Sequence, residues 1–395
     1  MEKHEKTGLI LTGGGARAAY QAGVLHAILR ILHDAGMRPG RTPFDIICGT
    51  SAGALNATAL ACRADNFASA VRGLLAVWEN FATQAVYRAD SLAVLRSGAR
   101  WLSLLSFGAL LRKWRAAPPD SLLDNTPLAG LLHRVLDLPR LDAALGNGAL
   151  HALAISASSY TSGQHLTFYQ SAARVEPWTR HGRQALATQI GVEHLLASSA
   201  IPFIFPAVPL YLGGRREYCG DGSMRQQAPI APAIHLGATR VLVVGAGRMS
   251  QAAPDAEGAA QDLGHGGYPN MAQVAGHALS SIFLDSLAAD IERLQRINHT
   301  LGRLAPEARA GLGLRDVKLL VIAPSERLDS IAARHSASLP APVRALLGAL
   351  GALESRGAAL ASYLLFEAGY TRELIRLGER DTLARRGDVL AFFAS

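Results

Sequence analysis

Residues 44–53 carry the side chain best suited to covalent chemistry in this sequence. They read Phe-Asp-Ile-Ile-Cys-Gly-Thr-Ser-Ala-Gly, an apolar strand that runs through a Gly-x-Ser-x-Gly turn into an alanine-rich helix. A serine hydroxyl becomes a useful nucleophile when it is held exposed beside a base and beside donors for an oxyanion. Gly49 and Gly53 lack the β-carbons that would clash in such a turn and where helix and strand approach closely. The strand-turn-helix setting therefore predicts that Ser51 is a nucleophile at an elbow.

A glycine-rich turn that precedes this elbow is suited to supply the oxyanion donors. Gly13-Gly14-Gly15-Ala16-Arg17 follows an expected strand at 7–11 and opens an expected helix at about 17–35. Successive N–H groups of such a loop point into one space, where the helix dipole also favours negative charge. We therefore predict an oxyanion hole in this loop. Arg17 adds a cation, which either stabilises the loop or faces the substrate.

The same glycines also fit a different function. Gly13-x-Gly15-x-x-Ala18 matches the dinucleotide fingerprint, which accepts alanine at its last position. That fingerprint needs an acidic residue at the end of the second strand to bind ribose. Here the strand runs into Cys-Gly-Thr-Ser at 48–51, so the acidic anchor is missing and the serine elbow takes its place. The pattern favours acyl chemistry over nucleotide binding, and we expect no cofactor.

The base that activates Ser51 should be a carboxylate or a histidine. Asp221 lies between Gly220 and Gly222, just beyond a strand-like stretch at 216–219. Glycines on both sides allow the turn and close approach that would bring its carboxylate to another loop, although a plain Asp-Gly turn has the same pattern. None of the thirteen histidines sits in an obvious motif. Those on or beside expected strands and helices read as core or surface residues; they are His151, His165, His194 and His235.

The first 62 residues contain two β-loop-α units, which predict an α/β fold with a largely parallel sheet. Further strands are expected at 150–156, 165–169, 240–245 and 317–322, and further helices at 191–198 and 271–301. An apolar stripe predicts that one side of the last helix faces the core. The stripe consists of Val274, Leu279, Ile282, Phe283, Leu287, Ile291 and Leu294.

Size and composition indicate a globular protein. The 395 residues suffice for one large domain or two, and a charged fraction of 18% beside a hydrophobic fraction of 49% argues against global disorder. No run approaches the ~18 consecutive apolar residues of a spanning helix, and the first residues do not read as a signal peptide. Three cysteines without metal-like spacing favour a reducing compartment. We expect a cytoplasmic protein with no metal site.

The formal charge of +8 points toward anionic partners. No zinc-finger spacing or helix-turn-helix signal is evident, so nucleic acid is not expected. Residues 87–119 mix apolar and cationic side chains, including Trp101, Trp114, Arg96 and Arg112. This mixture suits either an interfacial helix in peripheral contact with an anionic membrane or a packed helical hairpin. Residues 247–269 read as a mobile connection or the margin of a lid.

The chain resembles the patatin-like phospholipases, serine lipid acyl hydrolases that use a Ser-Asp dyad. Four blocks match in the expected order: residues 13–17, residues 49–53, the stretch Ala-Ser-Ser-Ala-Ile-Pro-Phe-Ile-Phe-Pro at 197–206, and Asp221-Gly222. The resemblance implies a three-layer α/β/α fold with a central, mostly parallel sheet and a helical C-terminal extension. It implies a catalytic domain at 1–325, with a helical insertion at about 85–120, followed by the extension at 326–395.

The resemblance also implies roles for individual residues. Ser51 would attack the acyl ester carbonyl, and Asp221 would accept the serine proton and later activate water. The oxyanion hole would be formed by the loop residues Gly14, Gly15, Ala16 and Arg17. The 197–206 block would help to wall the site. The sequence departs from many members at Ala18, where glycine is common, and at Ser223, whose hydroxyl is suited to bond the carboxylate and lower its pKa.

The substrate implied is a phospholipid or another fatty acyl ester, cleaved by a phospholipase A or lysophospholipase type of reaction. Three alternatives stay open on the sequence: acyl transfer to an alcohol, a Ser-His-Asp triad of the α/β-hydrolase type, and a non-catalytic lipid-binding protein of the same fold. The presence of both Ser51 and Asp221 argues against the last. The sequence does not define the acyl position, an activating partner or the oligomeric state.

Overall fold

A ten-stranded sheet organises the part of the chain that the computed structural model describes, namely residues 5–37, 40–90, 121–248, 271–353 and 357–394. The main strand order is β10-β9-β1-β2-β3-β4-β6-β5, and β8 pairs with both β3 and β7. The strands are β1 Thr7–Leu11, β2 Ile46–Thr50, β3 Ala152–Ser159, β4 His165–Ser171, β5 Thr179–Arg180, β6 Arg183–Ala187, β7 Val208–Leu212, β8 Arg215–Asp221, β9 Arg240–Val244 and β10 Lys318–Ile322.

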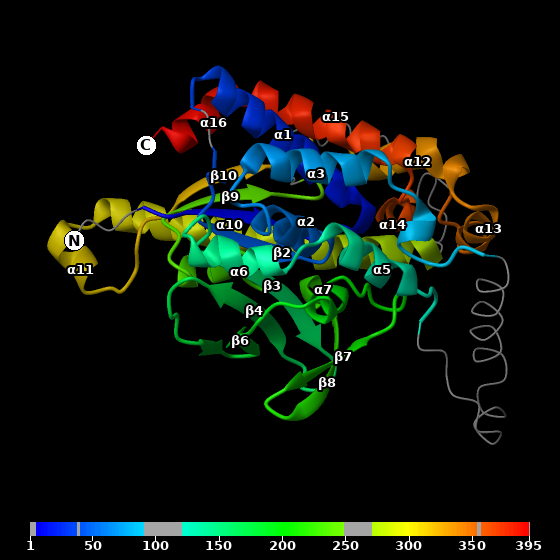
Figure 1. Cartoon of the computed structure of the whole chain (residues 1–395), viewed down its shortest axis with the longest axis horizontal. Helices are drawn as coiled ribbons and strands as arrows, with labels where there is room; N and C mark the ends of the chain where they lie inside the picture. Colours follow the sequence, from blue (N-terminus) through cyan, green and yellow to red (C-terminus); the bar gives the residue numbers. More distant parts are fainter. Residues whose placement is uncertain (1–4, 38–39, 91–120, 249–270, 354–356, 395) are drawn as a thin grey trace.

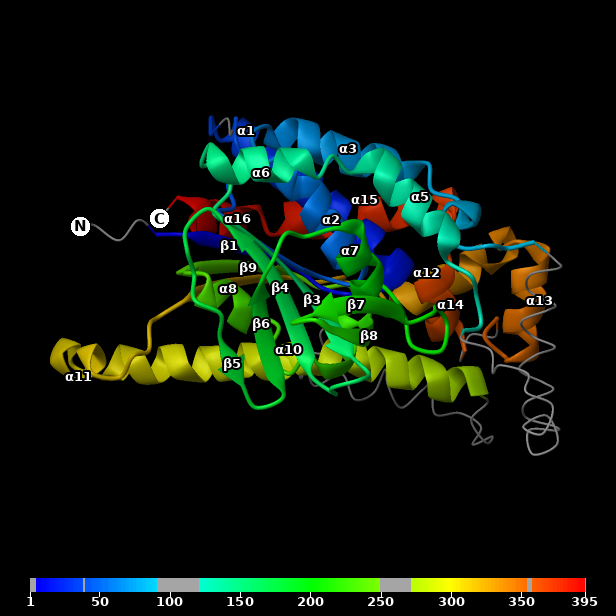
Figure 2. The ribbon, with the colours of Figure 1, turned by 60° about the horizontal axis from the view of Figure 1, so that its bottom comes forward.

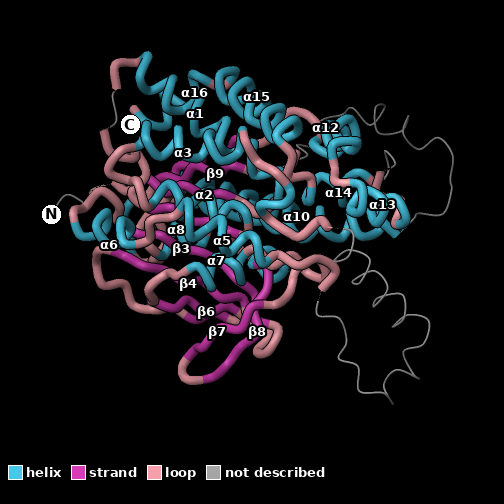
Figure 3. The backbone as a smooth tube through the Cα atoms, turned by 45° about the vertical axis from the view of Figure 1, so that its right-hand side comes forward, coloured by secondary structure: helices cyan, strands magenta, loops and turns pink. Residues whose placement is uncertain are grey.

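Five neighbouring strands, from β10 to β3, run parallel to one another. Their apolar side chains are buried on both faces, as parallel sheets require. On β1, for example, Leu9 and Leu11 enter one core cluster while Ile10 enters the other, because successive side chains of a strand point to opposite faces. The remaining strands add the antiparallel pairs β3–β4, β3–β8, β5–β6 and β7–β8 and the parallel pair β4–β6. Figure 3 shows the β7–β8 hairpin at the end of the molecule where β4 and β6 lie.

Helices cover both faces of the sheet (Figure 1). One core cluster joins the sheet to α1, α2, α3 and α15, and the other joins it to α8 and α10; Figure 2 shows α10 on the side of the sheet opposite α1 and α3. The helices are η1 Gly15–Ala18, α1 Ala19–Asp34, α2 Ala52–Ala61, α3 Phe67–Glu79, η2 Thr83–Ala85, α5 Thr126–Val135, α6 Pro139–Gly146, α7 Val192–Ser198, η4 Gly222–Arg225, α8 Ala231–His235, α10 Met271–Arg303, α11 Pro306–Ala310, α12 Leu328–His335, η5 Ser336–Ser338, α13 Ala341–Ala349, α14 Ala358–Leu364, α15 Ala368–Ala384 and α16 Arg386–Phe393.

The expected three-layer α/β/α architecture with a mostly parallel sheet is confirmed, as is the helical character of the C-terminal region. The expected strands and helices are present with small shifts at their ends. The helix expected at 17–35 begins as the short helix η1 before α1, and the strand expected at 44–48 lies at Ile46–Thr50. The strand runs on to Thr50 because Gly49 pairs with Leu11 and Thr50 with Ser156.

Helix α15 packs along α1 so closely that two glycines are required. A β-carbon added at Gly23 would lie 2.0 Å from the carbonyl oxygen of Ile375, and one at Gly378 would lie 2.3 Å from that of Tyr20. Real β-carbons do not approach backbone oxygens this closely, so any larger residue would push the two helices apart. The C-terminal helices are therefore tightly packed against the N-terminal β-loop-α unit.

Helix α10 departs in part from its predicted core stripe. Leu279, Phe283, Leu287, Ile291 and Leu294 are buried and Ile282 is half-buried. Val274 is 54% exposed, because it precedes Leu279 by five residues and so lies away from the face that Ala272 and Leu279 share. Residues 272–303 of this helix are the one candidate membrane span among the described residues, by length and composition alone. Such a single helix is weak evidence, because a core helix has the same length and composition. The cationic segment expected at 87–119 and the mobile segment expected at 247–269 fall almost entirely outside the described residues.

Candidate active site

Ser51 occupies a strained turn between β2 and α2. Its backbone has φ 55° and ψ −132°, a left-handed conformation that is unusual for a residue with a β-carbon. The turn directs the chain from the carboxyl end of a parallel strand into a helix, which is the geometry expected of a nucleophile elbow. The residue is 1% exposed, so its hydroxyl lies within the protein and is not held exposed, in contrast to what the sequence pattern predicted.

The glycines on either side of Ser51 allow this turn sterically. A β-carbon at Gly49 would lie 2.5 Å from the carbonyl oxygen of Gly53, and one at Gly53 would lie 2.2 Å from that of Leu11. The first contact is between β2 and α2, and the second is between α2 and the end of β1. The helix after the nucleophile therefore sits directly against the start of the glycine-rich loop.

Strand pairing brings Asp221 to the end of β2. On one edge of β3, Thr50 of β2 pairs with Ser156, and Asp221 of β8 pairs with the next residue, Ala157. The other edge of β3 is occupied by β4 along the same length. Strands β2 and β8 therefore occupy the same edge of β3, one after the other. Their ends meet about one residue apart along β3, which corresponds to a rise of about 3.3 Å. Ser51 directly follows Thr50, so this junction places the two predicted catalytic residues together.

Asp221 is completely buried, and burial raises its pKa to about 6. The hydroxyl of Ser51, the N–H of Ser223 and the hydroxyl of Ser223 each lower that pKa in part, and the Ser223 N–H donates to Oδ1 at 2.9 Å. Among the described residues, neither the second oxygen, Oδ2, nor the hydroxyl of Ser223 has a hydrogen bond of ordinary distance and angle. Catalytic hydrogen bonds are often poorly aligned before substrate binds. The carboxylate thus faces the nucleophile with one oxygen fixed and one available.

The 197–206 block holds both residues in place. The N–H of Ser51 donates to the hydroxyl oxygen of Ser198 at 2.9 Å, and the N–H of Asp221 donates to the carbonyl oxygen of Ala200 at 3.0 Å. Ser198 is fully buried at the end of α7. A single segment therefore fixes the backbones of the elbow and of the aspartate turn relative to each other.

The glycine-rich loop at 13–17 lies beside the turn that follows Asp221. A β-carbon at Gly13 would lie 2.6 Å from the hydroxyl oxygen of Ser223. Helix η1 begins at Gly15, and its first turn closes when the N–H of Arg17 donates to the carbonyl of Gly14 at 3.1 Å. The N–H groups of Gly14, Gly15 and Ala16 precede that bond, and the first N–H groups of a helix have no intrahelical acceptor.

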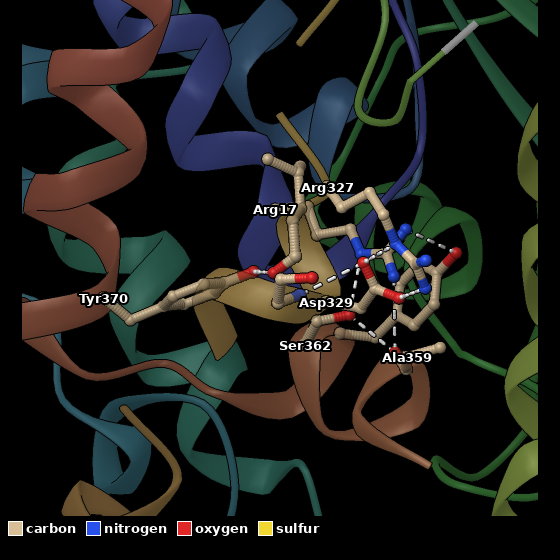
Figure 4. Close-up of polar contacts among 9 residues, drawn as sticks. Arg17, Arg327, Asp329, Ala359, Ser362 and Tyr370 are labelled. Atoms are coloured by element: carbon tan, nitrogen blue, oxygen red, sulfur yellow. Dashed lines mark hydrogen bonds and ion pairs between the residues drawn. The ribbon is translucent and has the colours of Figure 1, made fainter. Parts of the chain in front are cut away.

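Arg17 differs from the other predicted oxyanion donors, because its N–H is already donated to Gly14 and its side chain is directed into the C-terminal helices. Arg17 is 4% exposed, and its guanidinium donates to Ser362, Tyr363 and Ala359 of α14. Figure 4 shows Arg17 beside Ser362 and Ala359. Of the two roles left open by the sequence, this geometry supports stabilisation of the loop rather than contact with substrate.

Of the four histidines weighed as alternative bases, three are engaged away from Asp221, and the fourth, His165, borders the residue that follows Asp221. His151 contacts the amine of Lys6 at 2.9 Å, His165 borders the backbone of Gly222, His194 accepts from the N–H of Gly191 at 3.1 Å, and His235 stacks on Trp178 with 4.7 Å between ring centroids. Burial, followed by the charge of Arg183, lowers the pKa of His165 to about 4, so this ring is neutral at pH 7. None of these four contributes to the pKa shift of Asp221.

Two neighbours of the site gave no signal in the sequence. Gln226 donates to the hydroxyl oxygens of Thr50 and Ser156 at 2.8 and 3.3 Å, which ties the turn after Asp221 to β2 and β3. Tyr160 lies over Gly220, and its pKa is raised by burial and then by the charge of Asp221. Tyr160 directly follows β3 and Gln226 directly follows η4, and neither lies in a motif, so only the folded structure reveals them. Within the described residues, no cluster of three His, Cys, Asp or Glu side chains could hold a metal ion.

The sheet is mostly parallel, a strained serine follows one of its strands, and a buried aspartate lies beside that serine. These features are typical of the class of α/β proteins that carry a serine elbow between a strand and a helix. The sequence model of one family of that class, described as patatin-like phospholipase, matches residues 9–234. The chain therefore belongs to the patatin-like phospholipase family, and at the level of the family it is a lipid ester hydrolase. The match ends before α10, so the helices from α10 to α16 lie outside it.

Comparison with solved structures gives distant similarities. VipD from Legionella pneumophila is 13% identical, with 94% of this chain and 67% of VipD covered at a TM-score of 0.30. The type III effector protein ExoU is 15% identical, with 98% and 88% covered at a TM-score of 0.26. The complex of SpcU with ExoU from Pseudomonas aeruginosa gives 16% identity, 91% and 76% coverage and a TM-score of 0.22. No curated protein matched significantly. The family assignment rests on the sequence match.

Proposed function

We propose that the protein hydrolyses fatty acyl esters through an acyl-serine intermediate, with Ser51 as nucleophile and Asp221 as base. The observation that carries this proposal is the end-to-end meeting of β2 and β8, which sets a strained serine against a buried carboxylate of raised pKa. A general base is most effective when its pKa lies near the working pH. Burial gives Asp221 that property without a histidine.

In the first half of the reaction, Ser51 Oγ attacks the ester carbonyl while its proton passes to the Asp221 carboxylate. The carbonyl oxygen becomes an oxyanion, to which the N–H groups of Gly14, Gly15 and Ala16 would donate. The C–O bond to the alcohol then breaks, and the alcohol leaves with the proton from Asp221. In the second half, water attacks the acyl-serine and gives a proton to Asp221, which returns it to Ser51 as the fatty acid leaves.

Two substitutions test this assignment on a soluble short-chain ester. Ser51→Ala and Asp221→Asn should each lower kcat by at least ~10³-fold, because each removes a group that makes or breaks bonds. Asp290→Asn is the matched control, since Asp290 is also buried, has a pKa raised by burial and accepts a backbone N–H, at Ile230. Wild-type rates in a folded Ser51→Ala protein would refute the nucleophile. Full activity in Asp221→Asn would instead revive a triad with a histidine.

A fluorophosphonate probe separates hydrolysis from lipid binding alone. Covalent labelling of the wild type and none of Ser51→Ala is expected, because the probe reacts with an activated serine. Failure to label a folded wild-type sample would favour the non-catalytic alternative.

For the substrate, we propose a phospholipid or lysophospholipid at an anionic membrane surface. The support is family membership together with the apolar and cationic composition of residues 87–119. Lipid products formed by the wild type and by Ser51→Ala on mixed vesicles would identify the acyl ester cleaved. In addition, Trp101→Ala and Trp114→Ala should weaken binding to anionic vesicles and leave soluble-ester activity near normal. Unchanged vesicle binding would favour a packed hairpin.

A further inference from the structure

We propose that Ser362 and Tyr363 of α14 are positioning residues for the oxyanion hole, acting through Arg17. This inference rests on the proposed function, because it assigns a support to the donors of that site. The two residues lie in the part of the chain beyond the family match, which ends at residue 234. The support would therefore be a feature of this chain's C-terminal helices.

The first argument is the chemistry around Arg17. Its Nε donates to Ser362 Oγ at 2.8 Å, Nη1 to the hydroxyl of Tyr363 at 3.1 Å and Nη2 to the carbonyl of Ala359 at 3.4 Å. Its guanidinium carbon also lies 3.9 Å from the centroid of the Tyr363 ring. All these partners are neutral groups on one helix. A buried cation is costly unless its donors are bonded, so the position of Arg17 is fixed by α14.

No carboxylate in the described part of the chain forms an ion pair with Arg17. Asp329 lies near enough for the charge of Arg17 to lower its pKa. The ion pair of Asp329, at 2.8 Å, is nevertheless with Arg327. Burial raises the pKa of Asp329, while the hydrogen bond and charge of Arg327, followed by the charge of Arg17, lower it by more. Figure 4 shows these groups beside α14. The charge of Arg17 is thus compensated at a distance, and its direct contacts are those of α14.

The second argument is the contact between backbones. Gly15 has φ 53°, and a β-carbon there would lie 2.3 Å from the carbonyl oxygen of Tyr363. The Tyr363 ring stacks on Phe283 of α10 with 5.0 Å between centroids, and Phe283 in turn lies against Gly13. The glycine-rich loop therefore contacts the backbone of Tyr363 at Gly15 and the ring of Phe283 at Gly13, and the rings of these two neighbours stack on each other. Any displacement of α14 would move the N–H groups that precede Arg17.

The third argument is that α14 is itself anchored. The carbonyl of Leu364 accepts the buried hydroxyl of Tyr87 at 2.9 Å, and Tyr363 is 1% exposed. The helix therefore has a defined position from which to hold the loop. Because the oxyanion exists only after the nucleophile has attacked, misplaced donors would weaken the transition state and leave substrate binding unchanged.

The decisive variants are Ser362→Ala and Tyr363→Phe, assayed on a soluble ester. Loss of a complete oxyanion donor costs ~10²–10³-fold in kcat, so a small displacement of several donors should lower kcat about tenfold at unchanged KM. Ser336→Ala is the matched control, because the hydroxyls of Ser336 and Ser362 each donate to the carbonyl three residues earlier, at 2.9 and 2.5 Å. Only Ser362 also accepts from Arg17.

The proposal is overturned if Ser362→Ala and Tyr363→Phe keep the wild-type kcat, if Ser336→Ala loses as much, or if the loss appears in KM alone. If Ser362→Ala does not fold, as judged by circular dichroism, Tyr363→Phe decides, because it keeps the ring and removes one oxygen. The pH profile of kcat/KM should keep its position in the active variants, since the base is untouched. A wild type without hydrolysis, or with hydrolysis that survives Ser51→Ala, refutes the proposed function instead.

Discussion

The raised pKa of Asp221 leads to a quantitative prediction about pH. Burial raises this pKa from 3.8 to about 6, and the base must be ionised to accept the serine proton. At pH 5 a group with a pKa of 6 is ionised in only about a tenth of the molecules, whereas one with a pKa of 3.8 is ionised in over ~90%. We therefore expect kcat/KM to fall about tenfold between pH 8 and pH 5, along a single ionisation.

The assay is kcat/KM for a soluble short-chain ester from pH 4.5 to 8.5, since this parameter reports the pKa values of the free enzyme. A histidine base would give a similar limb, so the profile should be repeated at two temperatures. The ionisation of a carboxyl group is almost athermal, and that of an imidazole absorbs heat. A limb that does not move with temperature supports Asp221, and one that shifts to lower pH on warming would contradict the assignment.

A substitution sharpens the same test. The hydroxyl of Ser223 lowers the pKa of Asp221, so Ser223→Ala should move the acidic limb to higher pH. The N–H of residue 223, which donates to Oδ1 at 2.9 Å, would remain. Ser162→Ala is a suitable control, because its hydroxyl bonds to Glu217 on the surface. The reasoning is wrong if activity at pH 5 is undiminished, or if Ser223→Ala leaves the limb in place.

Three further predictions concern stability. Gly53→Ala should destabilise the fold by more than ~3 kcal/mol in urea unfolding, because its β-carbon would lie 2.2 Å from a carbonyl oxygen. The control Gly146→Ala should not destabilise the fold, because a β-carbon at this position of α6 meets open space. Ser198→Ala leaves the buried N–H of Ser51 without an acceptor and should cost about 1–3 kcal/mol; an unchanged urea midpoint would count against that bond. Folding raises the pKa of Asp221, so the ionisation of this group opposes folding as pH rises from about 4 to 6. Across that window, the free energy of unfolding of Asp221→Asn should therefore rise by about 3 kcal/mol relative to that of the wild type. A difference that stays constant with pH would refute the raised pKa.

The sequence predicted the central strands and the elbow well because their signals are local. An apolar run followed by Gly-x-Ser-x-Gly and small residues defines β2, Ser51 and α2 within a few positions. The end of β2 was less well defined, since Gly49 has low strand propensity and both Gly49 and Thr50 belong to the Gly-x-Ser-x-Gly pattern, yet both pair with neighbouring strands, Gly49 with β1 and Thr50 with β3. Propensity gives way to tertiary pairing at such positions.

The assembly of the site depended on contacts that no local pattern encodes. Asp221 was selected from its flanking glycines and from the family resemblance, but its position against β2 follows from the pairing of β8 with the free edge of β3. The partners of Arg17 lie about 345 residues away on α14, so the sequence left two roles open for this cation. Val274 was counted in the helical stripe but is exposed, because a spacing of five residues from Leu279 turns it roughly 140° away from the buried face.

The close packing of α1 on α15 also sets the order in which a newly made chain can complete its fold. Gly23 and Gly378 lie at opposite ends of the sequence, yet each fits only against the backbone of the other helix. A ribosome adds roughly 5–20 residues per second, so α1 waits tens of seconds for its partner to emerge. Contacts this distant in sequence also slow folding, because the loop between them must close first. The nascent chain would therefore remain without its complete N-terminal unit, and without a supported glycine loop, until α14 and α15 have been synthesised.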